Sequence, residues 1–334
     1  MDILLNVSAS AKIIEKIVIS GSKSESNRLL ILQQLFPEIS IDNLSDSDDS
    51  KHLQQALSTK ASFIDIGHAG TAMRFLVGYF SSKQNSEVIL TGSERMQQRP
   101  IGVLVEALRD LGADISYVEN EGYPPVRIKG KAITKDKVQI NGNVSSQYIS
   151  SLILMGTHLA KGVTIELMGE ITSIPYIKMT LSLLNQLGIS TYFEGNTIQV
   201  LPAKQLQKQT VVVESDWSSA SYFYSVAAFS EVGSEIQLSA YKKESLQGDS
   251  CLAEIYTYFG VETVFDQNTI TLKKVRTSDA GPLTLDLKNA PDIAQTIAVT
   301  CFGLGVACHL TGLHTLKIKE TDRLEALEAE LKKL

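Results

Sequence analysis

One arrangement of apolar and polar positions recurs three times along the chain. An amphipathic segment ends at a glycine and a short β-branched segment follows, in LRDLGADISYV, LNQLGISTYF and YTYFGVETVF. The three glycines, Gly112, Gly188 and Gly260, are 76 and 72 residues apart. Each case predicts an amphipathic helix, a glycine in the left-handed position after it, and then a strand. A period this long indicates a repeated supersecondary unit rather than a solenoid of small motifs.

The repeating unit is shortened at its first and at its last occurrence in the chain. In SDSDDSKHLQQALSTKASFIDIGHAG a predicted helix is followed by only a very short strand, so we expect an abbreviated first unit between about Ser58 and Gly67. The segment RLEALEAELKKL predicts a helix, with Asp322 and Glu325 in capping-box spacing. Its stripe of leucines comprises Leu324, Leu327, Leu331 and Leu334. The next glycine of the period would fall at about residue 335, so the last unit is expected to be incomplete.

Composition restricts the class of protein. A chain of 334 residues is long enough for two domains, and 43% hydrophobic with 20% charged residues is typical of a soluble globular protein. The net charge of −6 predicts no general attraction to nucleic acid or to an anionic membrane. No apolar run approaches the roughly 20 residues of a membrane span. The start, MDILLNVSAS, has no signal-peptide pattern, so we expect a cytoplasmic protein.

Neither cysteines nor histidines suggest a metal site. Cys251, Cys301 and Cys308 have no CxxC spacing, and the five histidines contain no HExxH pair. Free thiols in a reducing compartment are the simpler interpretation of the cysteines.

Several predicted helix starts carry groups that bind anions. The segment GSKSESNR places Lys23, Ser24 and Arg28 before and within the first turns of an apolar helix, where free N–H groups favour anions. It does not match the GxxxxGK[ST] phosphate loop, which disfavours a kinase. Taken alone, a capped helix with solvated charges explains this segment more simply.

Further segments repeat this chemistry. GHAGTAMRFL has Gly70, Thr71 and Arg74 at a helix start, and GSERMQQRPIG has Arg95 and Arg99 in a predicted loop. The remaining candidates lie in SSQYISSL, ITSIPYI, PDIAQTIA and KIKETDRL, and comprise Ser145, Ser146, Gln147, Ser173, Tyr176, Asp292, Lys319, Glu320, Asp322 and Arg323. Each alone is also explained by ordinary capping or by solvated charge. Together they favour a pair of anionic substrates.

Nine motifs, in order, resemble those of the EPSP synthase family of enolpyruvyl transferases. They are GSKSESNR, GTAMR, QQRPIG, SSQYISSL, SIPYI, SSASYF, LQGDS, PDIAQTIA and KETDRL, and they span nearly the whole chain. The resemblance implies a mixed α/β (α+β) class: the two-domain enolpyruvyl transferase fold, an inside-out α/β barrel of repeated βαβαββ units, with the last incomplete. Domain II would be 21–214, with three units and the first abbreviated. Domain I would be 1–20 plus 215–334, with the active site in the cleft between them.

The family's reaction is transfer of the enolpyruvyl group of phosphoenolpyruvate (PEP) to the 5-hydroxyl of shikimate 3-phosphate, with release of phosphate. The resemblance therefore implies a shikimate-pathway transferase that serves chorismate and aromatic amino acid biosynthesis and is a glyphosate target. It implies no cofactor and no metal. The expected partners are the two small-molecule substrates, with no nucleic acid and no membrane, and the expected state is a monomer.

The resemblance also assigns residues. For shikimate 3-phosphate it implies Lys23, Ser24, Arg28, Ser145, Ser146, Gln147, Ser173, Tyr176, Asp292 and Lys319. For PEP it implies Lys23, Gly70, Arg99, Gln147 and Arg323. The implied catalytic residues are Asp292 as the base on the 5-hydroxyl, Glu320 as the proton shuttle at C3, and Lys23 in contact with both substrates.

Some features depart from the family pattern. His68 stands where the family usually has asparagine, and Phe75 where it often has proline. The family's later DHR arginine and its C-terminal lysine have no counterpart before Leu334. Two alternatives follow. One is the related UDP-N-acetylglucosamine enolpyruvyl transferase, which uses a loop cysteine that is missing near GSERMQQRP. The other is a fragment that binds ligand without turnover.

Overall fold

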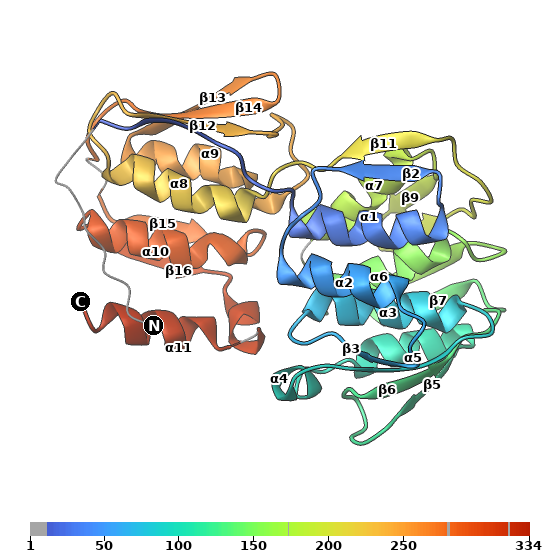
Figure 1. Cartoon of the computed structure of the whole chain (residues 1–334). Coiled ribbons are helices and arrows are strands. Elements are labelled where there is room, and N and C mark those ends of the chain that lie inside the picture. The colour runs from blue at the N-terminus through green and yellow to red at the C-terminus, as the bar shows by residue number, and fades with distance from the viewer. Residues whose placement is uncertain (1–11, 173, 279–280, 320) are drawn as a thin grey trace. The chain divides into compact units, whose positions relative to one another are not determined.

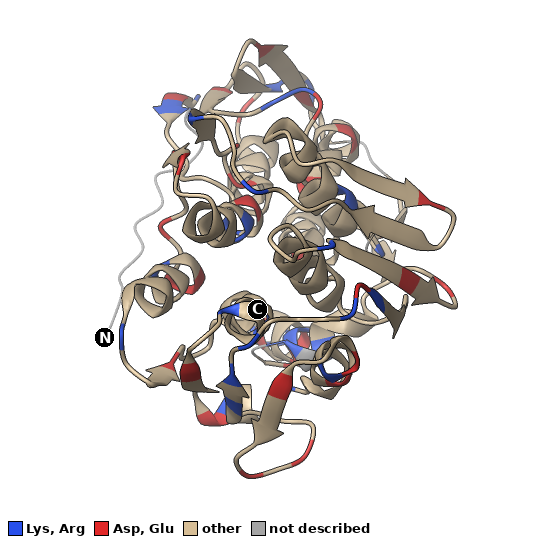
Figure 2. Ribbon diagram, turned by 90° about the vertical axis from the view of Figure 1, so that its right-hand side faces the viewer, with Lys and Arg blue, Asp and Glu red and all other residues tan. Residues whose placement is uncertain are grey.

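The structure, a computed structural model, describes residues 12–172, 174–278, 281–319 and 321–334 (Figure 1). The chain divides into two compact units. The first is Ser20–Val213, and the second contains residues 12–19 together with Glu214–Leu334. Basic and acidic residues are interspersed along the ribbon of both units (Figure 2). Among the described residues, no helix has the length and apolar character needed to cross a membrane.

The first unit contains two full βαβαββ repeats. The earlier one consists of β3 (Phe63–Asp65), α3 (Gly70–Ser82), β4 (Glu87–Thr91), α5 (Gly102–Leu111), β5 (Asp114–Tyr117) and β6 (Val126–Lys129). The later one consists of β7 (Lys137–Asn141), α6 (Ser146–Gly156), β8 (Val163–Met168), α7 (Ile174–Gln186), β9 (Thr191–Glu194) and β10 (Thr197–Val200). Their sheets have the same plan, β3-β4-β6-β5 and β7-β8-β10-β9, with one parallel pair and two antiparallel pairs.

The start of the first unit is an abbreviated repeat. It consists of α1 (Lys23–Leu35), β2 (Ile39–Asp42) and α2 (Asp48–Ser58), and β2 pairs in parallel with the distant β11 (Gln209–Val212). Only residues 59–62 separate α2 from β3. The very short strand expected after this helix is present as β3, but it pairs with β4. It therefore opens the next repeat instead of closing the first one.

The second unit repeats the plan with an N-terminal strand. Its first sheet, β1-β12-β14-β13, again has one parallel and two antiparallel pairs. The elements are β1 (Ile14–Ile17), α8 (Trp217–Phe229), β12 (Glu235–Ser239), η1 (Gly248–Cys251), α9 (Leu252–Ile255), η2 (Tyr256–Phe259), β13 (Val261–Asp266) and β14 (Thr269–Lys274). They are followed by β15 (Leu283–Asp286), η3 (Pro291–Ile293), α10 (Ala294–Gly303), β16 (Cys308–Thr311), η4 (His314–Ile318) and α11 (Arg323–Leu331), with β15 parallel to β16.

The three glycines of the sequence period have the predicted backbone conformation. Their φ angles are 107° at Gly112, 86° at Gly188 and 77° at Gly260. The prediction of an amphipathic helix before Gly260 is wrong, because the chain there forms the short helical segments η1, α9 and η2. Tyr256 and Phe259 are fully buried in the core of this unit. Packing of these aromatic side chains accounts for the broken helix, since tertiary contacts routinely override helical propensity.

Candidate active site

The start of α1 is held by a capped and hydrogen-bonded loop. Ser22 is the N-cap of α1, and its side chain accepts a hydrogen bond from the Glu25 amide at 3.5 Å. Lys23 and Ser24 follow in the first turn and are half-buried. Gly21 is required here, because a Cβ at this position would lie 1.9 Å from the Asn43 carbonyl oxygen. The first turn of α1 therefore has a fixed backbone position within its unit.

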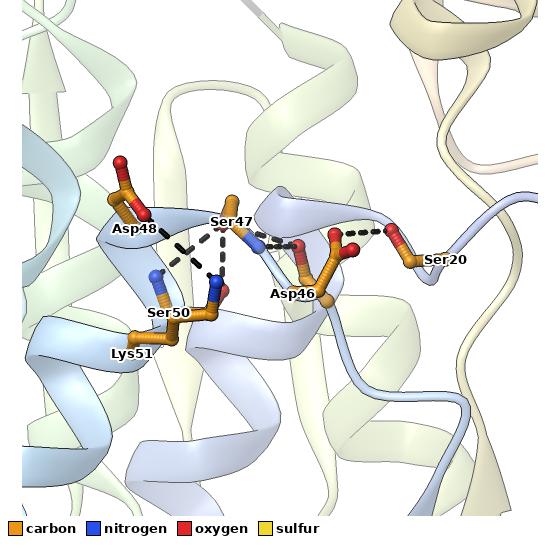
Figure 3. A network of polar contacts seen from close by, with 7 residues as sticks. Ser20, Asp46, Ser47, Asp48, Ser50 and Lys51 are labelled. Atoms are coloured by element: carbon orange, nitrogen blue, oxygen red, sulfur yellow. Dashed lines mark hydrogen bonds and ion pairs between the residues drawn. The ribbon is translucent and has the colours of Figure 1, made fainter.

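A polar network around the start of α2 supports the same loop (Figure 3). Ser20 Oγ donates to Asp46 Oδ1 at 2.7 Å, and Ser47 caps α2 by accepting from the Ser50 amide at 3.4 Å. Asn27 of α1 donates to Asp49 Oδ1 at 2.9 Å, and accepts from Ser50 Oγ at 2.8 Å. The two bonds of Asn27 therefore join α1 to the first turn of α2.

Arg28 lies inside the helical layer instead of at a solvated helix mouth. Its side chain is buried, with 2% of the residue exposed. Nε donates to Thr180 Oγ1 at 2.7 Å, and Nη2 donates to Ser150 Oγ at 3.0 Å. Nη1 donates to the Ser24 carbonyl at 2.7 Å, and Nη2 also reaches the Tyr176 carbonyl at 3.3 Å. Solvated charge, the simpler interpretation of this segment, is thus wrong for Arg28.

Burial lowers the pKa of this guanidinium but leaves it well above neutral pH. Loss of solvation lowers the pKa of Arg28 to about 10, against the opposing effects of Tyr176 and Glu25. Arg28 therefore stays cationic at neutral pH.

Gly70 and Arg99 lie against each other. A Cβ at Gly70 would lie 2.5 Å from Arg99 Nη1 and 2.8 Å from Arg99 Cζ, so the guanidinium covers the Gly70 α-carbon. Gly70 is the first residue of α3, and its N-cap, Ala69, provides no side-chain hydrogen bond. The structure thus brings two of the PEP candidates together at a helix start that lacks a side-chain cap.

Thr71 has a different role from the capping expected of it. Its Oγ1 accepts from Gln147 Nε2 at 3.2 Å, which connects α3 to the start of α6. Ser145 caps α6 and accepts from the Gln147 amide at 3.4 Å, while Ser146 is buried as the first residue of this helix. The cap predicted for SSQYISSL is confirmed. Gln147 therefore lies beside the Gly70 helix start.

The arginine-rich loop is partly helical. Arg95 lies in the one-turn helix α4 (Glu94–Gln97), capped by Ser93, and not in an irregular loop. Ser93 Oγ is also 2.9 Å from His68 Nδ1. His68 is exposed, at the position where the family usually has asparagine. Among the shikimate 3-phosphate candidates of this unit, Tyr176 lies in the first turn of α7, and Ser173 lies outside the described residues.

The second unit contains the candidate base. Asp292 lies in η3, immediately before the apolar helix α10. Its Oδ1 accepts from Lys319 Nζ at 3.3 Å and from Arg323 Nη1 at 3.0 Å. The three side chains are 25%, 24% and 27% exposed, respectively. One carboxylate and two cations, drawn from the two separate motifs PDIAQTIA and KETDRL, therefore form one cluster.

The residues around Arg323 are fixed by a helix cap. Asp322 is the N-cap of α11, and its Oδ1 accepts from the amides of Leu324 and Glu325 at 3.0 and 3.1 Å. The helix start predicted for KETDRL is confirmed. Glu320 lies outside the described residues.

Asp249 is a residue that the sequence analysis did not assign. It is 4% exposed, and Ser218 Oγ donates to its Oδ2. Burial, together with the negative charge of Asp292, raises the pKa of Asp249 to about 7. The available signal was its place in LQGDS, where an aspartate in a turn resembles an ordinary cap. Its proximity to Asp292 depends on tertiary structure.

The repeated βαβαββ units define an α/β protein, and its cation-bearing helix starts are candidate anion-binding sites. A family model for EPSP synthase (3-phosphoshikimate 1-carboxyvinyltransferase) matches residues 51–334. The chain belongs to this family.

Individual relatives agree with the family match. A 3-phosphoshikimate 1-carboxyvinyltransferase of Bacteroides fragilis is 47% identical over 330 residues, which cover 98% of this chain and 80% of the relative. The protein of that name from Histophilus somni is 35% identical over 362 residues, covering 99% and 82%. The solved EPSP synthase structure from Acinetobacter baumannii has a TM-score of 0.73 at 23% identity, covering 96% and 78%. This last similarity confirms the predicted two-domain enolpyruvyl transferase fold.

Proposed function

We infer that this chain transfers the enolpyruvyl group of PEP to the 5-hydroxyl of shikimate 3-phosphate, giving 5-enolpyruvylshikimate 3-phosphate and phosphate. The observation that carries this conclusion is the 47% identity to a named 3-phosphoshikimate 1-carboxyvinyltransferase over 98% of the chain. The cation-bearing helix starts of the first unit and the Asp292 cluster of the second support it.

Shikimate 3-phosphate would be bound by groups at the starts of α1, α6 and α7. Arg28 supplies a cation whose orientation is fixed by Thr180 and Ser150. The serines and the tyrosine supply neutral hydrogen-bond donors, and comprise Ser24, Ser145, Ser146 and Tyr176. Donors that are held in place before the ligand arrives lose little entropy on binding.

PEP would be bound at the adjacent helix start, by Gly70, Arg99 and Gln147, with Lys23 in contact with both substrates. Guanidinium binds carboxylate and phosphate in a bidentate manner, and glycine lets the ligand approach the backbone closely. Arg323 of the second unit would supply a further cation to this substrate. The adjacency of Gly70 and Arg99 supports the assignment.

The chemistry requires a base, an acid and stabilisation of charge. Asp292 would take the proton from the 5-hydroxyl as that oxygen attacks C2 of PEP, while C3 receives a proton, which we assign to Glu320. The resulting tetrahedral intermediate then loses phosphate from C2 and a proton from C3, which forms the new enol ether. Lys319 and Arg323 stabilise the ionised Asp292 carboxylate, which is the form able to accept a proton.

The cysteines do not favour the UDP-N-acetylglucosamine reaction. All three lie in the second unit, and burial raises the pKa of both Cys251 and Cys301 to about 12. These two thiols are therefore poor nucleophiles at neutral pH. The loop that contains Arg95 and Arg99 has no cysteine.

A direct choice between the two acceptors tests the proposed substrate. The protein is incubated with PEP and either shikimate 3-phosphate or UDP-N-acetylglucosamine, and products are identified by mass spectrometry. We expect the enolpyruvyl adduct of shikimate 3-phosphate only. An adduct of the nucleotide sugar alone would contradict the assignment. Cytoplasmic location and the monomeric state stay predictions.

A further inference from the structure

We propose that Arg74 and Tyr148 are positioning residues for PEP. They act by holding in place the backbone at Gly70 and the backbone next to Arg99. This inference rests on the proposed function, because it assigns a purpose to contacts around the PEP candidates. Neither residue belongs to the set implied by the motifs for substrate contact. Both lie in the first unit, on α3 and α6.

Arg74 contacts the backbone on both sides of the Gly70–Arg99 pair. Its Nη1 donates to the Gly70 carbonyl at 3.0 Å, and its Nη2 donates to the Pro100 carbonyl at 3.3 Å. Pro100 directly follows Arg99 in the chain. One buried guanidinium, with 4% of the residue exposed, therefore joins the first residue of α3 to the segment that carries Arg99.

Tyr148 makes a second bond to the same acceptor. Its hydroxyl donates to the Pro100 carbonyl at 2.6 Å. Its ring lies against Arg74, with 6.0 Å between the guanidinium carbon and the ring centroid. Tyr148 also follows Gln147, which bonds Thr71 of α3. The Pro100 carbonyl thus receives two donors from two different helices.

The helices that carry these donors are packed too closely to adjust. A Cβ on Gly78 of α3 would lie 2.3 Å from Ser151 Oγ of α6, and the same hydroxyl donates to the Arg74 carbonyl at 2.7 Å. Close packing transmits position from one element to the next. The backbone between α4 and α5 is irregular and is held by few backbone bonds, such as that from the Arg99 amide to the Met96 carbonyl at 3.0 Å. The two side-chain bonds to the Pro100 carbonyl add to them.

The charge of Arg74 is also unusual. Its contacts are two carbonyls, the Met96 sulfur at 3.7 Å and the Tyr148 ring, with no carboxylate among the described residues. Its Nε has no hydrogen-bond partner there. A buried cation without a counter-ion costs stability. Its positive charge, which lies against the Gly70 carbonyl, favours an anion at that helix start.

The test separates positioning of PEP from general support of the fold. Tyr148→Phe removes one hydroxyl and keeps the ring, and Arg74→Lys keeps the charge but not the two-carbonyl bridge. The matched controls are Tyr192→Phe, on the exposed face of β9, and Arg127→Lys, whose guanidinium meets Glu87 at the surface. For each protein, KM and kcat are measured for both substrates, together with the melting temperature. Kd values for PEP are measured by calorimetry with the protein alone, because the two substrates together would react.

We expect Tyr148→Phe to raise KM and Kd for PEP roughly 3- to 10-fold, the effect of one lost hydrogen bond, and Arg74→Lys to raise them further. KM for shikimate 3-phosphate should stay within about twofold in both variants and in the controls. Unchanged PEP constants in both folded variants would overturn the proposal. So would a parallel rise for both substrates with a lower melting temperature, which indicates structural support only.

The binding measurement also separates this proposal from the proposed function. If the wild-type chain binds PEP without turning it over, the proposed function fails, and the Kd values still decide the role of Arg74 and Tyr148. If it neither binds nor converts PEP, both proposals are wrong.

Discussion

At the scale of single residues, the arrangement of the PEP candidates depends on Gly70 having no side chain. Gly70 begins α3, and the guanidinium of Arg99 occupies the space where a Cβ would stand. The sequence predicts that a glycine here allows close approach to the backbone. It does not reveal that the approaching group includes an arginine of the same chain.

Gly70→Ala should therefore displace Arg99 without unfolding the protein. The added methyl would meet the far end of a flexible side chain at 2.5 Å, so the guanidinium moves and PEP loses a charge-assisted contact. We expect KM for PEP to rise about tenfold or more, with the melting temperature unchanged. Gly281→Ala is the matched control, because nothing lies within 4 Å of its added Cβ. Equal kinetics in the two variants would contradict this account.

Asp249 gives a prediction about pH. Burial raises the pKa of Asp249 in the folded protein to about 7, well above the ordinary value for an aspartate. The folded state thus holds this proton more tightly than the unfolded chain does. Its contribution to stability is full below pH 4 and is lost as the pH rises to about 7.

Asp249→Asn should remove this dependence. The amide oxygen can still accept from Ser218, and no charge forms. The melting temperature of the variant minus that of the wild type should increase from pH 4 to 7 and then level off. Thermal melts over that range provide the measurement. A difference that stays constant, or that decreases with pH, would show that Asp249 is not a buried acid.

At the scale of elements, α1 combines two basic residues with different surroundings. Lys23 is half-buried in the first turn, whereas Arg28, one turn later, donates to α6 and α7. In the sequence both residues stand at the start of one apolar helix. Only the packing of α1 against α6 and α7 distinguishes them, because it places Ser150 and Thr180 around the second cation and not the first.

Alanine substitutions should separate these roles. Lys23→Ala should leave the melting temperature of the free protein within a few degrees and abolish the stabilisation by added substrates. Arg28→Ala leaves two buried hydroxyls and two carbonyls without this donor, which costs about 2–4 kcal/mol and lowers the melting temperature by roughly 5 °C or more. Differential scanning calorimetry with and without both substrates makes the comparison. A large loss in Lys23→Ala alone would reverse the assignment.

The limits of sequence reasoning are also clearest for elements. The helix–glycine–strand period predicted the left-handed glycines, and the caps at Ser145 and Asp322 followed from local chemistry. The broken helix before Gly260 was missed because its aromatic residues satisfy tertiary packing. The partner of β3 was missed because a three-residue strand carries too little pattern to show which sheet it joins.

At the scale of the whole molecule, distant segments complete the sheets. β1 pairs with β12, and β2 pairs with β11, so each unit is closed by strands far apart in the chain. The period of the sequence indicates the units but not these pairings. The family resemblance supplied the two-domain fold, which the similarity to the solved EPSP synthase confirms.

The proposed catalytic base in the second unit gives a further prediction. Asp292→Asn should lower turnover by about two orders of magnitude or more, because the proposed base is lost, while shikimate 3-phosphate still binds. The fold should tolerate the change, since the ion pairs of Asp292 are partly exposed and contribute little to stability. Single-turnover kinetics and calorimetry provide the two readouts. Turnover close to that of the wild type would remove Asp292 from the role of base.

The most direct test of enolpyruvyl transfer is the release of inorganic phosphate from PEP by the wild-type chain. The assay is run with both substrates, with each substrate omitted in turn, and with Asp292→Asn as the matched inactive variant. We predict phosphate release only when PEP and shikimate 3-phosphate are both present, and a loss of that release in the variant. Release from PEP alone, or no release from the complete mixture by the folded wild-type protein, would contradict the assignment of this activity to the chain.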